Sequence, residues 1–154
     1  SMGIILVNAH GDIVMANPFA CIQFGYTENS MEGLVLEKII PQRFYHKHVG
    51  YRNSYIENPK SRGMGIGMTL SALKKDGSEF PVEISLGHFK SEDQQYAIAF
   101  VIDITRRHDY ENKILLQQAE MALVNEEIRQ MNINLESTVI QRTTELQKTL
   151  LTIT

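Results

Sequence analysis

The chain has 154 residues, of which 43% are hydrophobic, and its formal net charge is −3 at pH 7. This is enough for one ordinary core, and the mixture of acidic and basic residues lacks the basic stripe typical of nucleic-acid binding. No run of about 18 uncharged apolar residues is present, so we expect no direct membrane insertion, and the single cysteine excludes an internal disulfide and favours a cytoplasmic location.

The chain divides into two segments with different hydrophobic periods. Residues 3–105 form short alternating or helical stretches separated by Gly, Pro, Asn and Asp. Residues 106–154 contain neither Pro nor Gly. We therefore predict a globular domain over 3–105 and one long helix over 106–154.

Two short strands and a short helix are expected first. The strings "GIILVN" and "DIVMA" are separated by "AHG", in which Gly11 allows a tight turn. Asn17 and Pro18 then open a helix, "PFACIQFG", that should end at Gly25.

A second helix is predicted over residues 44–56. Phe44, His48, Tyr51 and Tyr55 recur at helical spacing and form one stripe, whereas His46 lies off it. The acidic residues of the preceding segment, Glu32 and Glu37, are interpreted as solvated.

Three strands complete the domain. Asp76 and Gly77 lie between two alternating runs, which is a strong hairpin signal. The first run places Ile66, Met68, Leu70 and Ala72 on one face, and the second places Phe80, Val82, Ile84 and Leu86 on one face. The third, "QYAIAFVIDIT", is apolar on both faces, so we expect both faces to be covered. Strands interspersed with short helices predict an α+β domain in which helices and an antiparallel sheet enclose a pocket.

Several of these strings resemble the PAS sensory domain family over nearly all of residues 3–105. The strings "NPFACIQFGY" and "KKDGSEFPVEISL" are similar to its first helix and its central hairpin, and Asp103, Ile104 and Thr105 to the exit that joins such domains to an output helix. The string "NLESTVIQRTTELQ" resembles the linker of bacterial sensor histidine kinases. The resemblance implies a PAS fold, and a sensory input module of a two-component kinase whose Asp103–Thr105 exit relays the signal. A PAS module of a cyclic-dinucleotide enzyme or a transcription regulator is the alternative.

The tail carries a heptad pattern. Met121, Val124, Ile128, Met131 and Leu135 recur at steps of three and four, and the pattern then shifts to Val139, Leu146 and Leu150. We call these eight residues the seam. A narrow seam predicts a parallel homodimer, and the phase shift after Leu135 predicts a local change in coiled-coil winding.

No catalytic constellation is found. Cys21 has no histidine nearby in sequence, His108 lacks the proline that follows a phosphoacceptor histidine, and no phosphate-binding loop is present. The fragment itself is therefore not expected to be an enzyme.

The pocket has two open interpretations. His48 lies where the haem-binding PAS oxygen sensors of rhizobial nitrogen-fixation kinases carry the proximal iron ligand, so the resemblance implies that haem b could bind. A neutral imidazole suits iron, and an apolar lining suits a porphyrin or another small molecule. Met68, however, stands where those sensors have an arginine, which favours an apolar or empty pocket. The candidate lining is Ile66, Met68, Leu70, Ile84 and Leu86.

Overall fold

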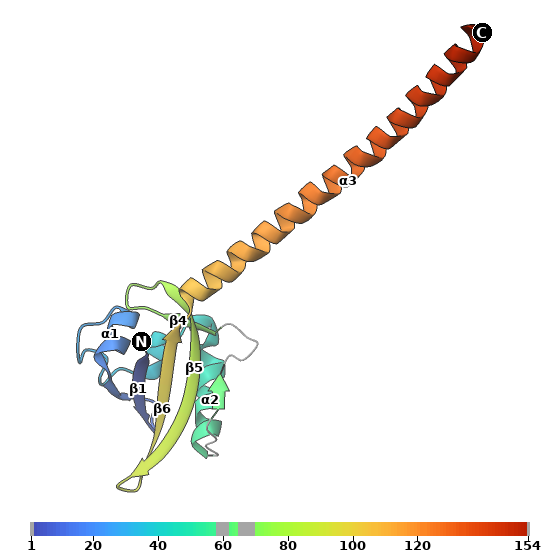
Figure 1. Cartoon of the computed structure of the whole chain (residues 1–154). Coiled ribbons are helices and arrows are strands. Elements are labelled where there is room, and N and C mark those ends of the chain that lie inside the picture. The colour runs from blue at the N-terminus through green and yellow to red at the C-terminus, as the bar shows by residue number, and fades with distance from the viewer. Residues whose placement is uncertain (1, 58–61, 65–69, 154) are drawn as a thin grey trace. The chain divides into compact units, whose positions relative to one another are not determined.

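The structure, a computed structural model, describes residues 2–57, 62–64 and 70–153, with backbone only for 62–64. It contains two compact units, Ser1–His108 and Asp109–Thr154 (Figure 1). The elements in chain order are β1 (Gly3–Asn8), β2 (Ile13–Ala16), α1 (Pro18–Phe24), the 3-10 helices η1 (Leu36–Ile39) and η2 (Gln42–Phe44), α2 (Tyr45–Glu57), β3 (Arg62–Met64), β4 (Leu70–Leu73), β5 (Glu79–Ser91), β6 (Gln94–Asp103) and α3 (Thr105–Ile153).

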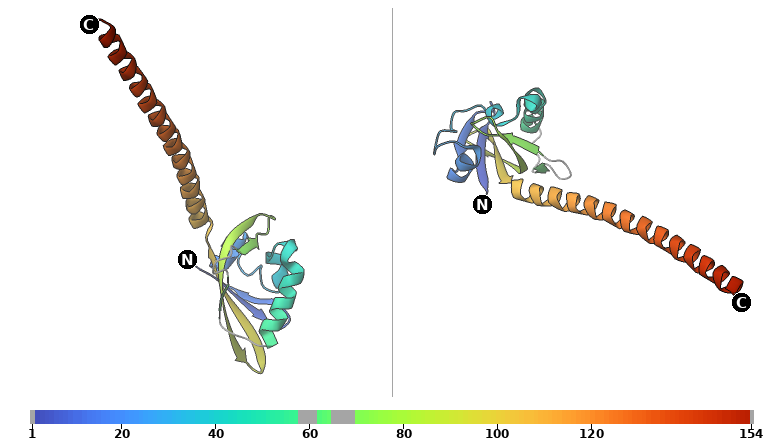
Figure 2. Two further views of the ribbon diagram at one scale, coloured as in Figure 1. Left: turned by 90° about the vertical axis from the view of Figure 1, so that its right-hand side faces the viewer. Right: turned by 90° about the horizontal axis from the view of Figure 1, so that it is seen from above.

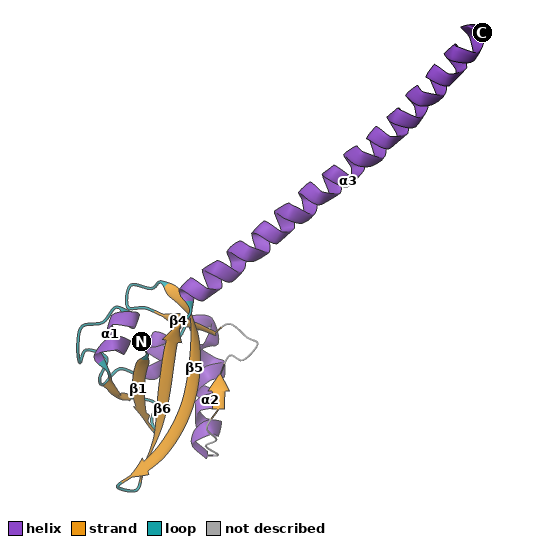
Figure 3. Ribbon diagram, in the orientation of Figure 1, coloured by secondary structure: helices purple, strands orange, loops and turns teal. Residues whose placement is uncertain are grey.

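The strands form one antiparallel sheet in the order β2-β1-β6-β5-β3, and β4 also pairs with β5 (Figure 3). The β5–β6 pairing runs from Val82↔Asp103 to Ser91↔Gln94, and β1 pairs with the other edge of β6 from Gly3↔Val101 onward. A strand sends alternate side chains to opposite faces, so this register places Val82, Ile84 and Leu86 on the same face as Ala99 and Val101. We call this the inner face. The α+β class predicted from the sequence is confirmed.

The core lies between the inner face and α1. Phe24 of α1 meets Phe80 of β5 edge to face, with ring centroids 5.2 Å apart. Ile5, Val82 and Val101 are buried against them. Burying such side chains fully is worth about 1.5–3 kcal/mol each, so this end of the sheet holds the domain together.

The boundaries of α1 follow from its capping residues, as predicted. The Asn17 side-chain oxygen accepts hydrogen bonds from the backbone N–H groups of Ala20 and Ile4, both at 2.9 Å. One side chain therefore caps the helix and attaches it to β1. Gly25 ends the helix in the left-handed conformation, with φ 73°.

The hairpin predicted at Asp76 and Gly77 is also present. Leu73 of β4 pairs with Glu79 of β5, and Gly77 has the positive φ of 86° that the turn requires. Residues 65–69, which include the predicted lining residues Ile66 and Met68, lie outside the described residues.

On the opposite, outer face of the sheet the prediction that both faces are covered holds only in part, since Ile98 and Phe100 of β6 are half-buried. Ile102 on the outer face is 42% exposed and Met15 of β2 is 38% exposed.

Helices α1 and η1 contribute their buried side chains to the inner face. Tyr55 of α2 meets His88 on the same face edge to face, and Figure 2 shows α2 beside the sheet. α1, η1 and α2 thus lie on the inner side, whereas Arg107 in the first turn of α3 pairs with Glu83 on the outer side.

The stripe predicted for α2 is wrong in part. Phe44 lies in η2 rather than α2, and Tyr51 is 62% exposed. The face of α2 that turns inward carries His48, Arg52 and Tyr55, which follow the same i, i+4, i+7 spacing. An arginine, which sequence periodicity counts as polar, takes the inward place because it has a buried acidic partner.

We predict that Phe24→Ala lowers the free energy of unfolding by about 3–5 kcal/mol, since it empties the centre of the core. Ile22→Ala on the same helix is the matched control, because Ile22 is 73% exposed and its truncation should change stability by less than about 0.5 kcal/mol. Urea denaturation followed by circular dichroism measures both. Equal losses for the two variants would contradict the core described above.

Candidate sensory site

The centre of the candidate site is a buried carboxylate, Glu37 of η1. Its side chain is 2% exposed. Arg52 Nη1 donates to both carboxylate oxygens, at 2.6 and 2.8 Å, and His48 Nδ1 lies 3.2 Å from Oε1. The cluster joins η1 to α2 through two side chains that are one helical turn apart. We call Glu37, His48 and Arg52 the α2 cluster.

The sequence-based interpretation of Glu37 as solvated is wrong. Its position within "LVLEKII", with apolar residues on both sides, was the available signal for burial. A buried carboxylate needs a paired charge and hydrogen bonds, and Arg52 and His48 supply them. Neither partner could be assigned from sequence, because they lie 15 and 11 residues away on another helix.

The imidazole of His48 is held in its neutral form. Burial lowers the pKa of His48 below its usual value; the Glu37 hydrogen bond and charge oppose this shift without reversing it, and the Arg52 charge adds to it. A carboxylate can only accept, so the neutral ring donates from Nδ1 and leaves the lone pair of Nε2 available.

Three residues of the candidate lining lie together on the inner face. Leu70, Ile84 and Leu86 are half-buried, whereas Val82 and Val101 nearer to α1 are 1% and 2% exposed. The inner face is therefore tightly filled beneath α1 and less so toward Leu86. Among residues 2–57 and 70–153, no group of three or more His, Cys, Asp or Glu side chains is arranged to hold a metal ion.

The exit from the domain is a compact capping arrangement. Asp103 Oδ1 accepts from the Thr105 backbone N–H at 2.8 Å and from its hydroxyl at 2.5 Å. Ile104 N donates to the carbonyl of Pro81 in β5 at 3.0 Å, and its own carbonyl accepts from His108 N at 2.9 Å. Ile104 therefore makes a backbone bond to the sheet and also the first bond of α3. Arg107 adds an ion pair with Glu83 of β5.

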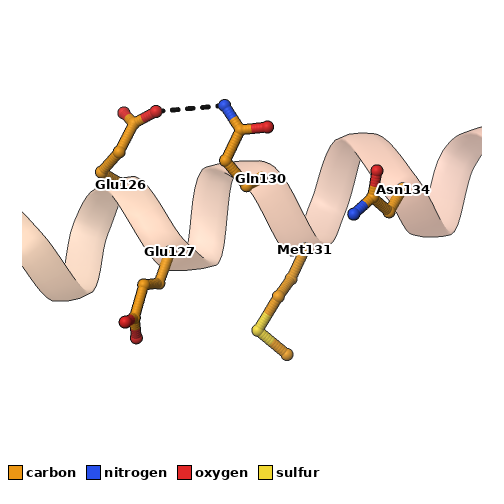
Figure 4. Close-up of a pocket in the computed structure, with 5 residues that line it drawn as sticks. All are labelled: Glu126, Glu127, Gln130, Met131 and Asn134. Carbon is orange, nitrogen blue, oxygen red and sulfur yellow. Dashed lines mark hydrogen bonds between the residues drawn. The ribbon is translucent and has the colours of Figure 1, made fainter.

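The unit that contains most of α3 is a helix without a buried residue. All eight seam residues are at least half exposed, from 50% for Ile128 to 67% for Met131. Two shallow grooves border the seam: the first is lined by Met131 and four polar neighbours (Figure 4), and the second contains Leu135 and Val139. The second groove lies at the phase shift. No helix of the described chain has the length and apolarity to cross a bilayer.

Comparison with known proteins identifies the family. A model of the PAS domain matches residues 1–106, so the chain belongs to the PAS domain family. It is 26% identical over 121 residues to the sensor protein FixL of Bradyrhizobium diazoefficiens, covering 79% of this chain and 24% of that protein. It is 29% identical over 102 residues to the oxygen sensor protein DosP of Escherichia coli, covering 66% of this chain and 13% of that protein. The chain thus spans a quarter or less of these relatives.

Solved structures share the fold. The PAS domain of an HTR-like protein from Haloarcula marismortui superposes with a TM-score of 0.56 at 24% identity, covering 67% of this chain and 81% of that one. A PAS domain from a two-component sensor histidine kinase gives 0.52 at 15% identity, covering 66% and 84%. The chain is therefore a PAS domain followed by a long helix.

We predict that His48 makes the stability of the protein without added cofactor pH-dependent. Its folded pKa is below the value of about 6.5 that histidine has in unfolded chains, so between these two values the unfolded chain binds more protons. The stabilising contribution is complete above pH 6.5 and is lost as the pH falls toward the lowered pKa. Urea denaturation at pH 7.5 and 5.5 should show a smaller loss for His48→Gln than for the unmodified protein. The exposed His46, changed to Gln, is the control, and identical losses in all three proteins would refute the prediction.

Proposed function

We propose that this chain is the sensory input and dimerisation module of a bacterial two-component sensor histidine kinase located in the cytoplasm. The PAS core would respond to a small molecule or a packing change, and α3 would carry the response to an output domain outside this chain. A PAS module of a cyclic-dinucleotide enzyme or a transcription regulator would share this architecture, and the sequence that follows Thr154 in the full-length protein would distinguish them.

The observation that carries this proposal is the continuity of β6 and α3. Ala99 on the inner face of β6 pairs with Leu86 of the candidate lining, and the same strand runs through Asp103 and Ile104 into the helix. A displacement of β6 by a ligand would therefore move the first turn of α3. A ligand shifts such an equilibrium only if it binds the two states with different affinities.

Dimerisation through α3 is supported by its exposed seam. An isolated helix with a narrow apolar stripe is marginal in water, because most helical stability comes from tertiary packing. Met131, Leu135 and Val139 are all more than half exposed, so their apolar side chains are available to pack against a facing helix. The phase shift after Leu135 gives the seam two ways to pack, which is the kind of bistable element that signalling requires.

We predict that Ile128→Cys and Leu146→Cys crosslink between chains under mild oxidation, because both positions would face the partner helix across the seam. Ile133→Cys is the matched control: it lies five residues beyond Ile128, on the other side of the helix, and is 49% exposed compared with 50%. Non-reducing gel electrophoresis reports the crosslink. The parallel dimer is refuted if neither seam position forms disulfide-linked dimers.

A haem-based sensor is the second candidate, and the α2 cluster favours it. His48 is neutral, and its Nδ1 atom contacts the carboxylate of Glu37. Histidines that bind a metal through one ring nitrogen commonly make such a contact with the other. Arg52 Nε is buried with no hydrogen-bond partner among the described residues, so this cluster retains an unsatisfied cationic donor beside His48. Leu70, Ile84 and Leu86 offer apolar contact. Bound haem would supply an iron centre that binds a diatomic gas or changes redox state.

We predict that purified protein mixed with haemin develops a Soret band that His48→Ala abolishes or shifts, since His48 would be the iron ligand. His46→Ala should leave the band unchanged, because His46 is exposed and lies off the inward face of α2. Absorbance spectra of the ferric and ferrous forms measure this. Absence of a Soret band in the unmodified protein, or a band that His48→Ala does not alter, rules out the haem site.

A further inference from the structure

Glu37 in the α2 cluster has more polar partners than a buried carboxylate in this fold needs. Glu37 would be satisfied by Arg52 without His48, because Arg52 already reaches both carboxylate oxygens. The His48 ring nevertheless presents Nδ1 to Oε1 at 3.2 Å. The contact with His48 is therefore not needed to satisfy Glu37, and its effect is to orient the imidazole ring.

The position of Glu37 is fixed from a third element. Arg52 packs directly on the turn between β1 and β2, where a Cβ placed on Gly11 would lie 1.9 Å from Arg52 Nη1. Gly11 also accepts a hydrogen bond from Leu36 N, at 2.8 Å, immediately before Glu37. The carboxylate therefore cannot move toward or away from α2 without disturbing both the guanidinium and the turn.

A carboxylate fixed in this way controls the ring that it contacts. It accepts the proton of Nδ1, so it selects the tautomer whose Nε2 carries the lone pair, and it limits rotation about the bond that orients the ring. A carboxylate on the far nitrogen of a ligating histidine also raises its basicity, and loss of such a partner typically weakens metal binding 10–100-fold.

We propose that Glu37 is the positioning residue for His48 as an iron ligand, and that Arg52, seated on the Gly11 turn, holds Glu37 in place for this role. The inference rests on the proposed haem site. Helix η1, which carries Glu37, would then influence the binding of the iron in addition to contacting α2. The haem-facing atom would be His48 Nε2, and Glu37 itself would not touch the iron.

The test uses the full chain reconstituted with haemin and compares Glu37→Gln with Glu79→Gln. The glutamine keeps the shape of Glu37 and removes its charge. Glu79 pairs with Arg43 on the surface through contacts of 2.5 and 2.6 Å, so it matches the chemistry without touching the α2 cluster. The first readout is the rate of haem transfer to an excess of a scavenging apoprotein, and the second is the iron–histidine stretching frequency of the ferrous form.

Glu37→Gln should transfer haem about 10–100-fold faster and lower the stretching frequency, because the ring loses a charged acceptor. Glu79→Gln should match the unmodified protein in both readouts. If Glu37→Gln does not fold because Arg52 is left without its countercharge, the double variant Glu37→Gln, Arg52→Gln removes both charges and is measured in its place. Circular dichroism establishes that each variant is folded.

The outcomes separate the two proposals. If the unmodified protein binds no haem, or if His48→Ala leaves the iron–histidine band in place, the haem site fails and the role of Glu37 fails with it. If haem is bound through His48 and the glutamine variant shows neither faster transfer nor a lower frequency, Glu37 is a structural residue only. A faster transfer with an unchanged frequency would likewise refute positioning, since it would report a looser pocket and an unaltered ligand.

Discussion

The pairing of β5 with β6 is the constraint on which the rest of the molecule depends. It runs from Val82↔Asp103 to Ser91↔Gln94, and it fixes the inner and outer faces of the sheet together. A slip of one residue would place Val82 and Val101 on opposite faces of the sheet, so that one of them would leave the core beneath Phe24. The same pairing places Ala99 beside Leu86 near the candidate pocket and ends at the residue that caps α3. The core, the candidate pocket and the exit to α3 therefore all depend on the register of β5 with β6.

The α2 cluster is a set of polar contacts that holds helix α2 in place. Helix α2 presents polar residues, His48 and Arg52, on the side that turns toward the domain, so hydrophobic burial alone does not explain how it is held. Arg52 and Glu37 attach it to η1, and the close approach to Gly11 attaches both to the first turn of the sheet. A buried ion pair of this kind adds little net stability, but it requires one specific arrangement. Such an arrangement suits a site that must present His48 in one orientation.

Much of the fold could be predicted from the sequence because its signals are local. Asn17 with Pro18 marks a helix start, Asp76 with Gly77 marks a hairpin, and the absence of Pro and Gly after Thr105 indicates an uninterrupted helix. The site was predicted in part, since helical spacing places His48 on the inward face but wrongly favoured Tyr51 over Arg52. The role of Glu37 could not be found by periodicity, because its partners are set by tertiary packing. The seam and its dimer remain predictions, because a single chain contains no partner helix.

The bonding at Ile104 implies that the length of this junction matters as much as its composition. Its N–H belongs to the sheet and its carbonyl to the helix, so no residue between β6 and α3 is free to absorb a change in chain length. Inserting one residue after Ile104 would turn everything downstream by about 100° and advance it by about 1.5 Å. The inserted protein would still fold and could still pair its helices, but its output would be out of phase with its sensor. Under the proposed relay through α3, the length of this junction would set the face of the helix on which a movement of β6 is felt.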